Sequence, residues 1–273
     1  MKKYVITIIS AIMLLGTTAY ANDMSTVDEA LLERGYPQNV LEHMCDENKL
    51  EIYNNEDLHY GGATMVQYWE ETGESRIIDM DNPGSTYGQI PSADFTMMLT
   101  PSGKTTNGKL EYIDFVFDYE WDEIPINRYQ DPITVGFDYN GLNYRLNYDI
   151  FRKVDKYTYT DNTMSTKTAT HSDEPAAAEK SRYGVNWYAD LKGGVVHSLY
   201  GYGKFRVDGS TPTASGEMDV NFMYAHAKSA IGVTIPVPKV PGAALSITSG
   251  ASTCDSMGDA MLIKWANGKI TSY

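Results

Sequence analysis

Two acidic residues with the spacing of a hydrolytic pair lie near the middle of this 273-residue chain. Asp118 and Glu120 are two positions apart, so in an extended strand their side chains share a face and their Cα atoms are about 7 Å apart. Inverting glycosidases separate their two carboxyl groups by about 6.5–9.5 Å, and retaining ones by about 5–5.5 Å. Asp114 and Asp118 would be about 13 Å apart, too far to act on one bond. Asp118 and Glu120 are therefore the candidate catalytic residues of a β-jelly-roll glycoside hydrolase.

The same stretch also offers a binding face. Tyr112 and Asp114 lie on its acidic side, and rigid amphipathic rings beside polar groups suit contact with sugars or proteins. Acidic residues that alternate with core residues are also how an outer strand face meets water. Because no catalytic signature accompanies the carboxylates, the sequence favours binding over catalysis. We expect a non-catalytic extracellular or cell-surface protein whose partner is a glycan or a protein, with Tyr112 and Asp114 as ligand-binding residues.

A secreted pore-forming β protein is a third function class. Residues 216–224 and 231–237 alternate apolar and polar side chains, and an inserting barrel uses amphipathic hairpins of this kind. The same alternation serves any β-sandwich, so this class ranks behind the binding protein and the glycosidase.

Metal, nucleotide and nucleophile chemistry find no support. The histidines are scattered singly and none forms a zinc-type pair, so no metal site and no cofactor are predicted; they are His43, His59, His171, His197 and His226. Asp79 and Asp81 resemble the start of a calcium loop, but Pro83 and Ile90 stand where ligands are needed. An acidic turn and a weak calcium site remain the alternatives there. No serine lies in a Gly-x-Ser-x-Gly elbow, and no glycine-rich phosphate loop follows a strand.

The candidate residues lie on the most regular segment of the chain, residues 109–121. Every second residue is large and apolar, and carboxylates dominate the positions between them, which is the two-residue period of a half-buried strand. The apolar face consists of Ile113, Phe115, Phe117, Tyr119 and Trp121. The sequence therefore predicts a strand with one face in the core and its acidic face in water.

Short runs of this kind, separated by turn residues and without helical crossovers, continue to the end of the chain. They predict an all-β fold, with one antiparallel β-sandwich or jelly-roll-like domain over 58–273. Asn140 and Gly141 predict a hairpin between 133–138 and 142–151, with Tyr144, Leu146 and Tyr148 on one face of the second strand. The polar tract 161–182 is expected to be a mobile loop. Residues 22–57 predict a short helical segment that packs on the β domain.

The only two cysteines are Cys45 and Cys254, which lie near opposite ends of the chain. An even number in an oxidising compartment is typical of a disulfide. Closing so long a loop would contribute at most roughly 5 kcal/mol. Two buried free thiols are the alternative, and the sequence leaves both open.

Residues 1–21 have the form of a bacterial signal peptide. Lys2 and Lys3 precede an apolar run over 4–15, and Ala19 and Ala21 fit cleavage after Ala21. The apolar run is too short for a stable membrane span, so a secreted, extracellular protein is expected. Removing the leader leaves 20 basic against 36 acidic residues, a net charge of −16. Because nucleic-acid binders need a basic surface, this charge argues against a nucleic-acid partner.

Overall fold

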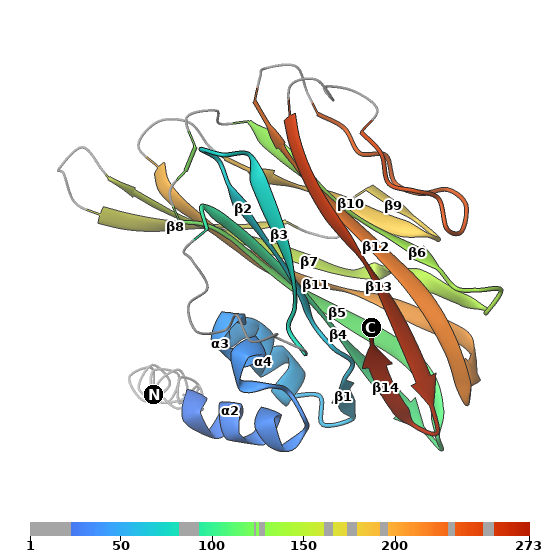
Figure 1. Cartoon of the computed structure of the whole chain (residues 1–273). Coiled ribbons are helices and arrows are strands. Elements are labelled where there is room, and N and C mark those ends of the chain that lie inside the picture. Colours follow the sequence, from blue (N-terminus) through green and yellow to red (C-terminus); the bar gives the residue numbers. More distant parts are fainter. Residues whose placement is uncertain are drawn as a thin grey trace, which may run out of the picture.

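Two antiparallel sheets pack face to face, and three short helices lie against the outer face of one of them (Figure 1). The structure is a computed structural model. It describes residues 23–81, 93–122, 124–125, 129–160, 166–173 (backbone only), 179–191, 196–228, 233–247 and 254–273. The predicted fold class, an antiparallel β-sandwich after a short helical segment, is confirmed. The predicted signal peptide lies outside the described residues.

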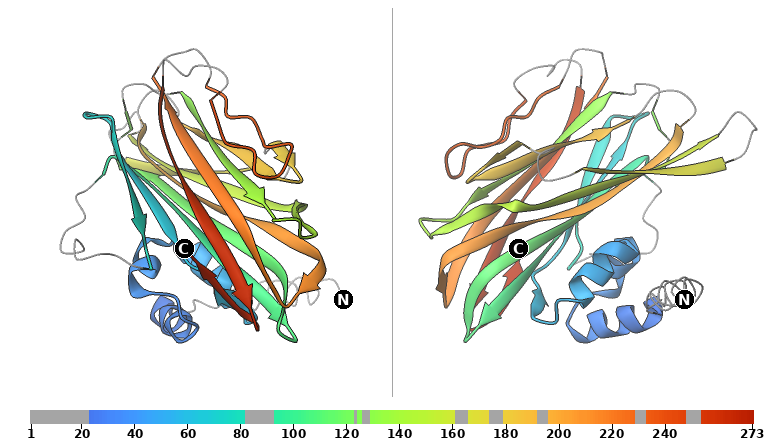
Figure 2. Two further views of the ribbon diagram at one scale, coloured as in Figure 1. Left: turned by 45° about the vertical axis from the view of Figure 1, so that its right-hand side comes forward. Right: turned by 180° about the vertical axis from the view of Figure 1, so that it is seen from behind.

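The larger sheet, sheet A, has the strand order β3-β2-β4-β5-β11-β7-β8, with β1 paired to β4. Its strands are β1 (Leu58–Tyr60), β2 (Thr64–Trp69), β3 (Glu74–Asp79), β4 (Phe95–Thr106), β5 (Lys109–Trp121), β7 (Tyr144–Thr160), β8 (Thr166–Asp173) and β11 (Val196–Thr213). Sheet B has the order β14-β13-β12-β6-β10-β9. Its strands are β6 (Gln130–Asp138), β9 (Glu179–Ser181), β10 (Gly184–Asp190), β12 (Ser215–Ala227), β13 (Cys254–Ala266) and β14 (Lys269–Ser272). Figure 2 shows the two layers from the side and from behind.

The apolar face predicted for 109–121 is confirmed in β5. Its five large residues are buried in the core between the sheets. Phe117 stacks on Trp187 of sheet B with ring centroids 4.5 Å apart, and Trp121 Nε1 donates to Tyr224 Oη at 3.0 Å. Stacked and edge-on ring pairs stabilise a core beyond the area they bury, so the rings of β5 hold the two layers together.

The acidic face of β5 is covered by protein, which corrects the expectation that it meets water. Asp114 and Asp118 are buried, and Glu120 at the end of the strand is exposed. The cover consists of α2 (Met24–Glu33), α3 (Gln38–His43) and α4 (Asp46–Tyr53), whose apolar residues pack on the sheet. That second core contains Val27, Leu31, Val40, Ile52, Met65, Met98 and Val116. The alternation of side chains identified the two faces of β5. It did not indicate that a layer of helices buries the polar face.

Ion pairs join the helical segment to two lysines on sheet A, one on β7 and one on β11. Lys156 Nζ and Glu47 Oε1 are 2.5 Å apart, and Lys204 Nζ lies at the same distance from Glu51 Oε1. Helices of 10, 6 and 8 residues are marginal in isolation. We infer that apolar packing on the sheet and these ion pairs together hold the segment in place.

The Asn140–Gly141 turn forms, but it does not make a hairpin. Both residues have positive φ angles, 47° and 79°, as a two-residue turn of this type requires. However, β6 pairs with β10 and β12 in sheet B, whereas β7 pairs with β11 and β8 in sheet A. The turn therefore carries the chain from one sheet to the other. Which strands pair after the turn is decided by backbone partners distant in sequence. The residues of the turn do not indicate those partners.

Two further segments differ from expectation. The tract 161–182 contains β8, which pairs along β7, and β9, so among its described residues it is not simply a loop. Threonine-rich segments suit strands even when neither face is apolar, and for that reason the lack of periodicity was misleading. The described part of 231–237 does not pair with 216–224 as a hairpin, because β12 pairs with β13 and β6. The described part, from Val233, packs on Ala225 and Ala227 at the outer face of sheet B.

An ion pair is buried inside the sandwich. The side chains of Lys153 and Asp155 on β7 are 4% and 1% exposed, and Lys153 Nζ lies 2.8 Å from Asp155 Oδ2. Lys153 also donates to the Tyr188 carbonyl oxygen at 2.6 Å, and Tyr119 Oη donates to Asp155. The Tyr119 ring lies over Gly201, where a Cβ atom would stand 2.0 Å from the ring. Glycine at 201 therefore permits the close approach that the Tyr119–Asp155 hydrogen bond needs.

Both cysteines are free thiols. Cys45 precedes α4 on the outer side of sheet A, and Cys254 packs with the apolar cluster on the outer side of sheet B. The two sheets lie between them, so the two cysteines do not form a disulfide in the structure. Of the two alternatives, free thiols are the one observed. Among the described residues, no helix combines the length and the apolar character needed to cross a bilayer.

Candidate functional site

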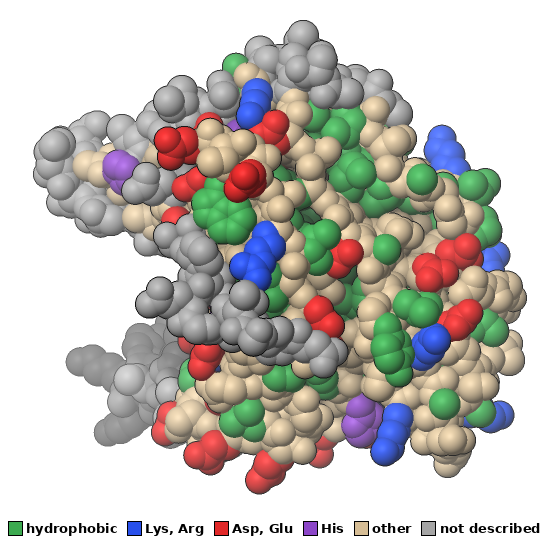
Figure 3. Space-filling model, viewed as in Figure 1, with side chains coloured by type: hydrophobic (Ala, Val, Ile, Leu, Met, Phe, Trp, Pro, Cys, Tyr) green, Lys and Arg blue, Asp and Glu red, His purple; other side chains and the backbone are tan. Residues whose placement is uncertain are grey.

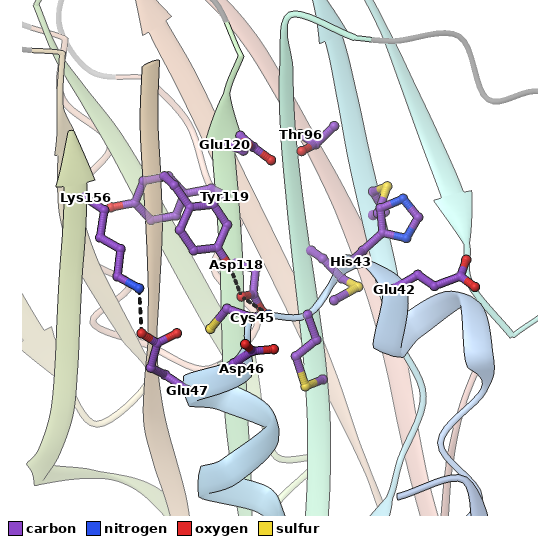
Figure 4. A pocket seen from close by; sticks show the side chains of 14 residues that line it. Glu42, His43, Cys45, Asp46, Glu47, Thr96, Asp118, Tyr119, Glu120 and Lys156 are labelled. Atoms are coloured by element: carbon purple, nitrogen blue, oxygen red, sulfur yellow. Dashed lines mark hydrogen bonds and ion pairs between the residues drawn. The ribbon is translucent and has the colours of Figure 1, made fainter. Parts of the chain in front are cut away.

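A cavity of about 510 Å³ lies between the helical segment and the outer face of sheet A. Its walls come from the α3–α4 junction and from β2, β4, β5, β7 and β11. Figure 4 shows Glu120 beside Thr96 on neighbouring strands, Asp118 next to Cys45 at the start of α4, and His43 on the helical side. The candidate pair Asp118 and Glu120 therefore does line one cavity, as the sequence predicted for a shared face.

Asp118 is fully engaged by protein donors. Its Oδ1 accepts the Cys45 backbone N–H at 3.0 Å and the Tyr200 hydroxyl at 2.6 Å. Its Oδ2 accepts Asn48 Nδ2 at 3.0 Å. Burial raises the pKa of the Asp118 carboxyl despite these three donors. Since two donors belong to the start of α4 and one to β11, this carboxylate anchors the helical segment on the sheet.

Cys45 is not set up as a nucleophile. Burial, followed by the neighbouring Asp118 carboxylate, raises the pKa of its thiol. The thiolate is the reactive form of cysteine, and these surroundings disfavour it. Instead Cys45 Sγ accepts the Asn48 backbone N–H at 3.3 Å, which caps the first turn of α4. The thiol thus has a structural part in the site.

Glu120 is the carboxylate that faces the opening. Its side chain is exposed, and across the described residues it forms no hydrogen bond or ion pair. Partial burial in the cavity raises the pKa of Glu120, Asp122 raises it further, and His43 acts in the opposite direction. His43 Nδ1 bonds the Asn39 carbonyl oxygen at 2.8 Å, so its Nε2 is not used by that contact. Glu120 is therefore placed to meet a ligand.

The cavity combines negative charge with sulfur-rich apolar surface. Among the described residues, five carboxylates line it against one lysine, and that lysine, Lys156, is already paired with Glu47. The carboxylates belong to Glu42, Asp46, Glu47, Asp118 and Glu120. The apolar lining is Met44, Met65 and Met98, all buried. Figure 3 shows acidic side chains gathered along the lower edge of the molecule, over the helices.

The two residues predicted to bind a ligand, Tyr112 and Asp114, lie outside this cavity. Arg206 holds the Asp114 carboxylate through Nε at 2.5 Å and Nη2 at 2.7 Å. The Arg206 guanidinium stacks 3.6 Å from the centroid of the Tyr112 ring, and Tyr112 Oη accepts Asn55 Nδ2 at 3.0 Å. Tyr112 is half-buried, not the exposed ring expected of this face. Tyr112 thus bonds to Asn55 just after α4, and Asp114 is paired within sheet A.

The acidic turn at Asp79 and Asp81 is satisfied by protein donors. Asp81 accepts Tyr60 Oη at 2.5 Å and Ser272 Oγ at 3.3 Å, and Asp79 accepts the Asp81 N–H at 2.9 Å. Residues 82–92, which complete the calcium-like stretch, lie outside the described residues. In the ranges that the structure describes, no three His, Cys, Asp or Glu side chains are placed to share a metal ion.

Sequence reasoning missed most of the cavity. Its helical wall, with His43 and Glu47, is separated by more than 60 residues from β5, and its other wall, with Lys156 and Tyr200, comes from two later strands. No local motif links these positions. The available signal was Asp118 itself, which alternation placed on the same face as Glu120.

No protein-family model matches the chain, and no curated protein matches its sequence. Among solved structures, it is similar to one described as a pore forming protein, with a TM-score of 0.32 and 9% identity over 67% of this chain and 92% of that chain. It is also similar to the collagen-binding domain from a Staphylococcus aureus adhesin, with a TM-score of 0.25 and 9% identity over 55% of this chain and 87% of that chain. Both likenesses are remote in sequence and in shape.

Proposed function

We propose that this chain is an exported binding protein that holds a basic side chain of a protein ligand in the cavity beside α3 and α4. The observation that carries the proposal is the cavity lining, which combines buried methionines with several carboxylates. One of these carboxylates, Glu120, forms no hydrogen bond or ion pair among the described residues. The leader expected over residues 1–21 and the net charge of −16 expected for the mature chain support a role outside the cell.

A lysine or arginine side chain matches both parts of this lining. Its aliphatic stem can lie along the thioethers of Met44, Met65 and Met98, which are adaptable apolar surfaces. Its charged end would reach Glu120 and Glu42 near the opening, and hydrogen bonds between two ionised groups are about twice as strong as neutral ones. Of the two ligand classes that the sequence left open, the acidic lining therefore favours a protein over a neutral glycan.

The glycosidase alternative needs two carboxylates that are free to act on one bond. Asp118 accepts three hydrogen bonds from the protein, which leaves it poorly placed to protonate a leaving group or activate water. The neutral thiol of Cys45 adds no nucleophile. These contacts support a binding role for the cavity.

Three short peptides test the proposal: one with two arginines between glycines, its lysine counterpart, and the same peptide with two glutamates. We expect calorimetric titration to detect saturable binding of the basic peptides alone. Glu120→Gln should weaken binding about tenfold, since losing one charged contact costs about 1.5 kcal/mol. Binding should also weaken as the pH falls through the Glu120 pKa, which lies above the ordinary 4.5, because protonation removes the negative charge.

Glu71→Gln is the matched control, because Glu71 is exposed in the turn between β2 and β3, away from the cavity. It should bind the arginine peptide like the wild type. Equal affinity for the glutamate peptide, or an unchanged affinity in Glu120→Gln, would contradict the proposal. If the wild type released reducing sugar from a polysaccharide and Glu120→Gln did not, the cavity would be a hydrolytic site and the binding proposal would be wrong.

A further inference from the structure

A second site lies where β7 leaves its regular pairing with β11. Phe205 pairs with Phe151 and Val207 pairs with Leu146, so residues 147–150 of β7 all lie opposite Arg206. Sequence alternation placed Tyr148 on the same face as Tyr144 and Leu146, but the extra residues turn it outward. Tyr148 is 50% exposed, whereas Tyr144 and Leu146 are buried. Bulges that redirect a side chain are over-represented beside functional sites.

The contacts of this bulge hold its backbone, and among the described residues the Tyr148 side chain forms no hydrogen bond. Asn147 Oδ1 accepts the Asp149 N–H at 2.9 Å, and Asn147 Nδ2 donates to Asp208 Oδ2 at 2.6 Å. Lys180, on the edge strand β9 of sheet B, donates from Nζ to the Tyr148 carbonyl oxygen at 2.8 Å. The bulge is therefore fixed to both sheets, and its aromatic ring is presented on a rigid support.

A cavity of about 490 Å³ lies beside this ring, at the open edge between the two sheets. Arg145 and Arg182 line it with exposed side chains, together with Asn147, Asp149 and Asp208. Within the described residues, Arg145 makes no ion pair or side-chain hydrogen bond. Arg182 makes one long hydrogen bond, 3.3 Å from Nη2 to Asn143 Oδ1.

We propose that this cavity is a binding site for an anionic sugar, with Tyr148 as the platform for the sugar ring. A rigid ring with a polar edge gives contact area at low entropic cost. Arg145 and Arg182 offer forked donors that match a carboxylate or a sulfate, and Asp149 and Asn147 can bond ring hydroxyls. With Lys180 beside it, the described part of the site has three cations against two carboxylates, unlike the acidic cavity beside the helices.

Titrations with a sulfated heparin octasaccharide, with sialyllactose and with lactose test this site. We expect saturable binding of at least one anionic sugar, and which one binds distinguishes sulfate from carboxylate recognition. Tyr148→Ala should weaken that binding about tenfold, and Arg145→Gln and Arg182→Gln should each weaken it several-fold, as loss of a stacked ring or a charged contact implies. Tyr148→Phe keeps the ring and should retain affinity to within about twofold.

Two controls separate this site from general charge effects and from the helical-side cavity. Lys269→Gln removes an exposed cation on β14, at the edge of sheet B opposite β9, and should leave sugar binding unchanged, as should Glu120→Gln. All the altered side chains are exposed, so the variants are expected to fold, which far-ultraviolet circular dichroism checks. The proposal is overturned if neither anionic sugar binds, if lactose binds equally well, or if Tyr148→Ala and both arginine variants bind like the wild type.

Discussion

Replacing Lys153 by methionine is expected to lower the free energy of unfolding by about 3–5 kcal/mol, the usual cost of removing one partner of a buried ion pair. The Asp155 carboxylate would remain in the core, where it is 1% exposed, without its cation. The Tyr119 and Tyr157 hydroxyls would still donate to it, but neither carries a compensating charge. Urea denaturation of the two proteins at neutral pH measures the difference.

The double variant Lys153→Met/Asp155→Leu is the matched control for this prediction. It removes both charges, and apolar replacements of whole buried pairs are often neutral or stabilising. We expect it to recover at least half of the stability lost in the single variant. A loss below about 1 kcal/mol in Lys153→Met would contradict a buried pair at this position.

The second large effect is expected at Asp118. Asp118→Ala leaves the Cys45 N–H and the Tyr200 hydroxyl without their acceptor, and each buried donor left unsatisfied costs about 1–3 kcal/mol. We predict a total loss of about 2–6 kcal/mol in the free energy of unfolding. Asp118→Asn keeps one acceptor oxygen and should show a smaller loss. Urea denaturation again provides the measurement.

Glu120→Ala is the informative comparison, because Glu120 lies two residues along the same strand face but is exposed. Surface substitutions away from specific contacts usually change stability by less than about 0.5 kcal/mol. A stability loss at position 118 that is absent at position 120 is the expected pattern. If both alanine variants had equal stability, Asp118 would not anchor the helical segment.

The layered β architecture was predictable because it depends on a local period. Along β5 the large apolar side chains at alternate positions from Ile113 to Trp121 all proved to face the core, since alternation is a geometric property of any strand. The short helical segment was likewise predictable, and α2, α3 and α4 all lie within the predicted range 22–57. What the period does not report is which elements meet, and it therefore did not show that Asp114 and Asp118 lie under helices.

The failures share this physical cause. The Asn140–Gly141 turn has the conformation that its residues demand, but the chain then enters the other sheet. The extra residues of the bulge at 147–150 reverse which side chains of β7 face the core, so Lys153 and Asp155 point inward. Bulges and sheet changes are decided by pairing with distant strands. The cavity beside the helices depends on the same long-range contacts. The sequence predicted only the part of its wall that β5 provides.

Methyl NMR of methionine-labelled protein during titration with the arginine peptide tests the proposed cavity most directly. We predict that the methyl signals of Met44, Met65 and Met98, which line the cavity, shift as the peptide binds. Met218 and Met261, which are buried between the sheets, should not shift, and Glu120→Gln should reduce all three shifts at the same peptide concentration. Binding that leaves these three signals in place would contradict the account.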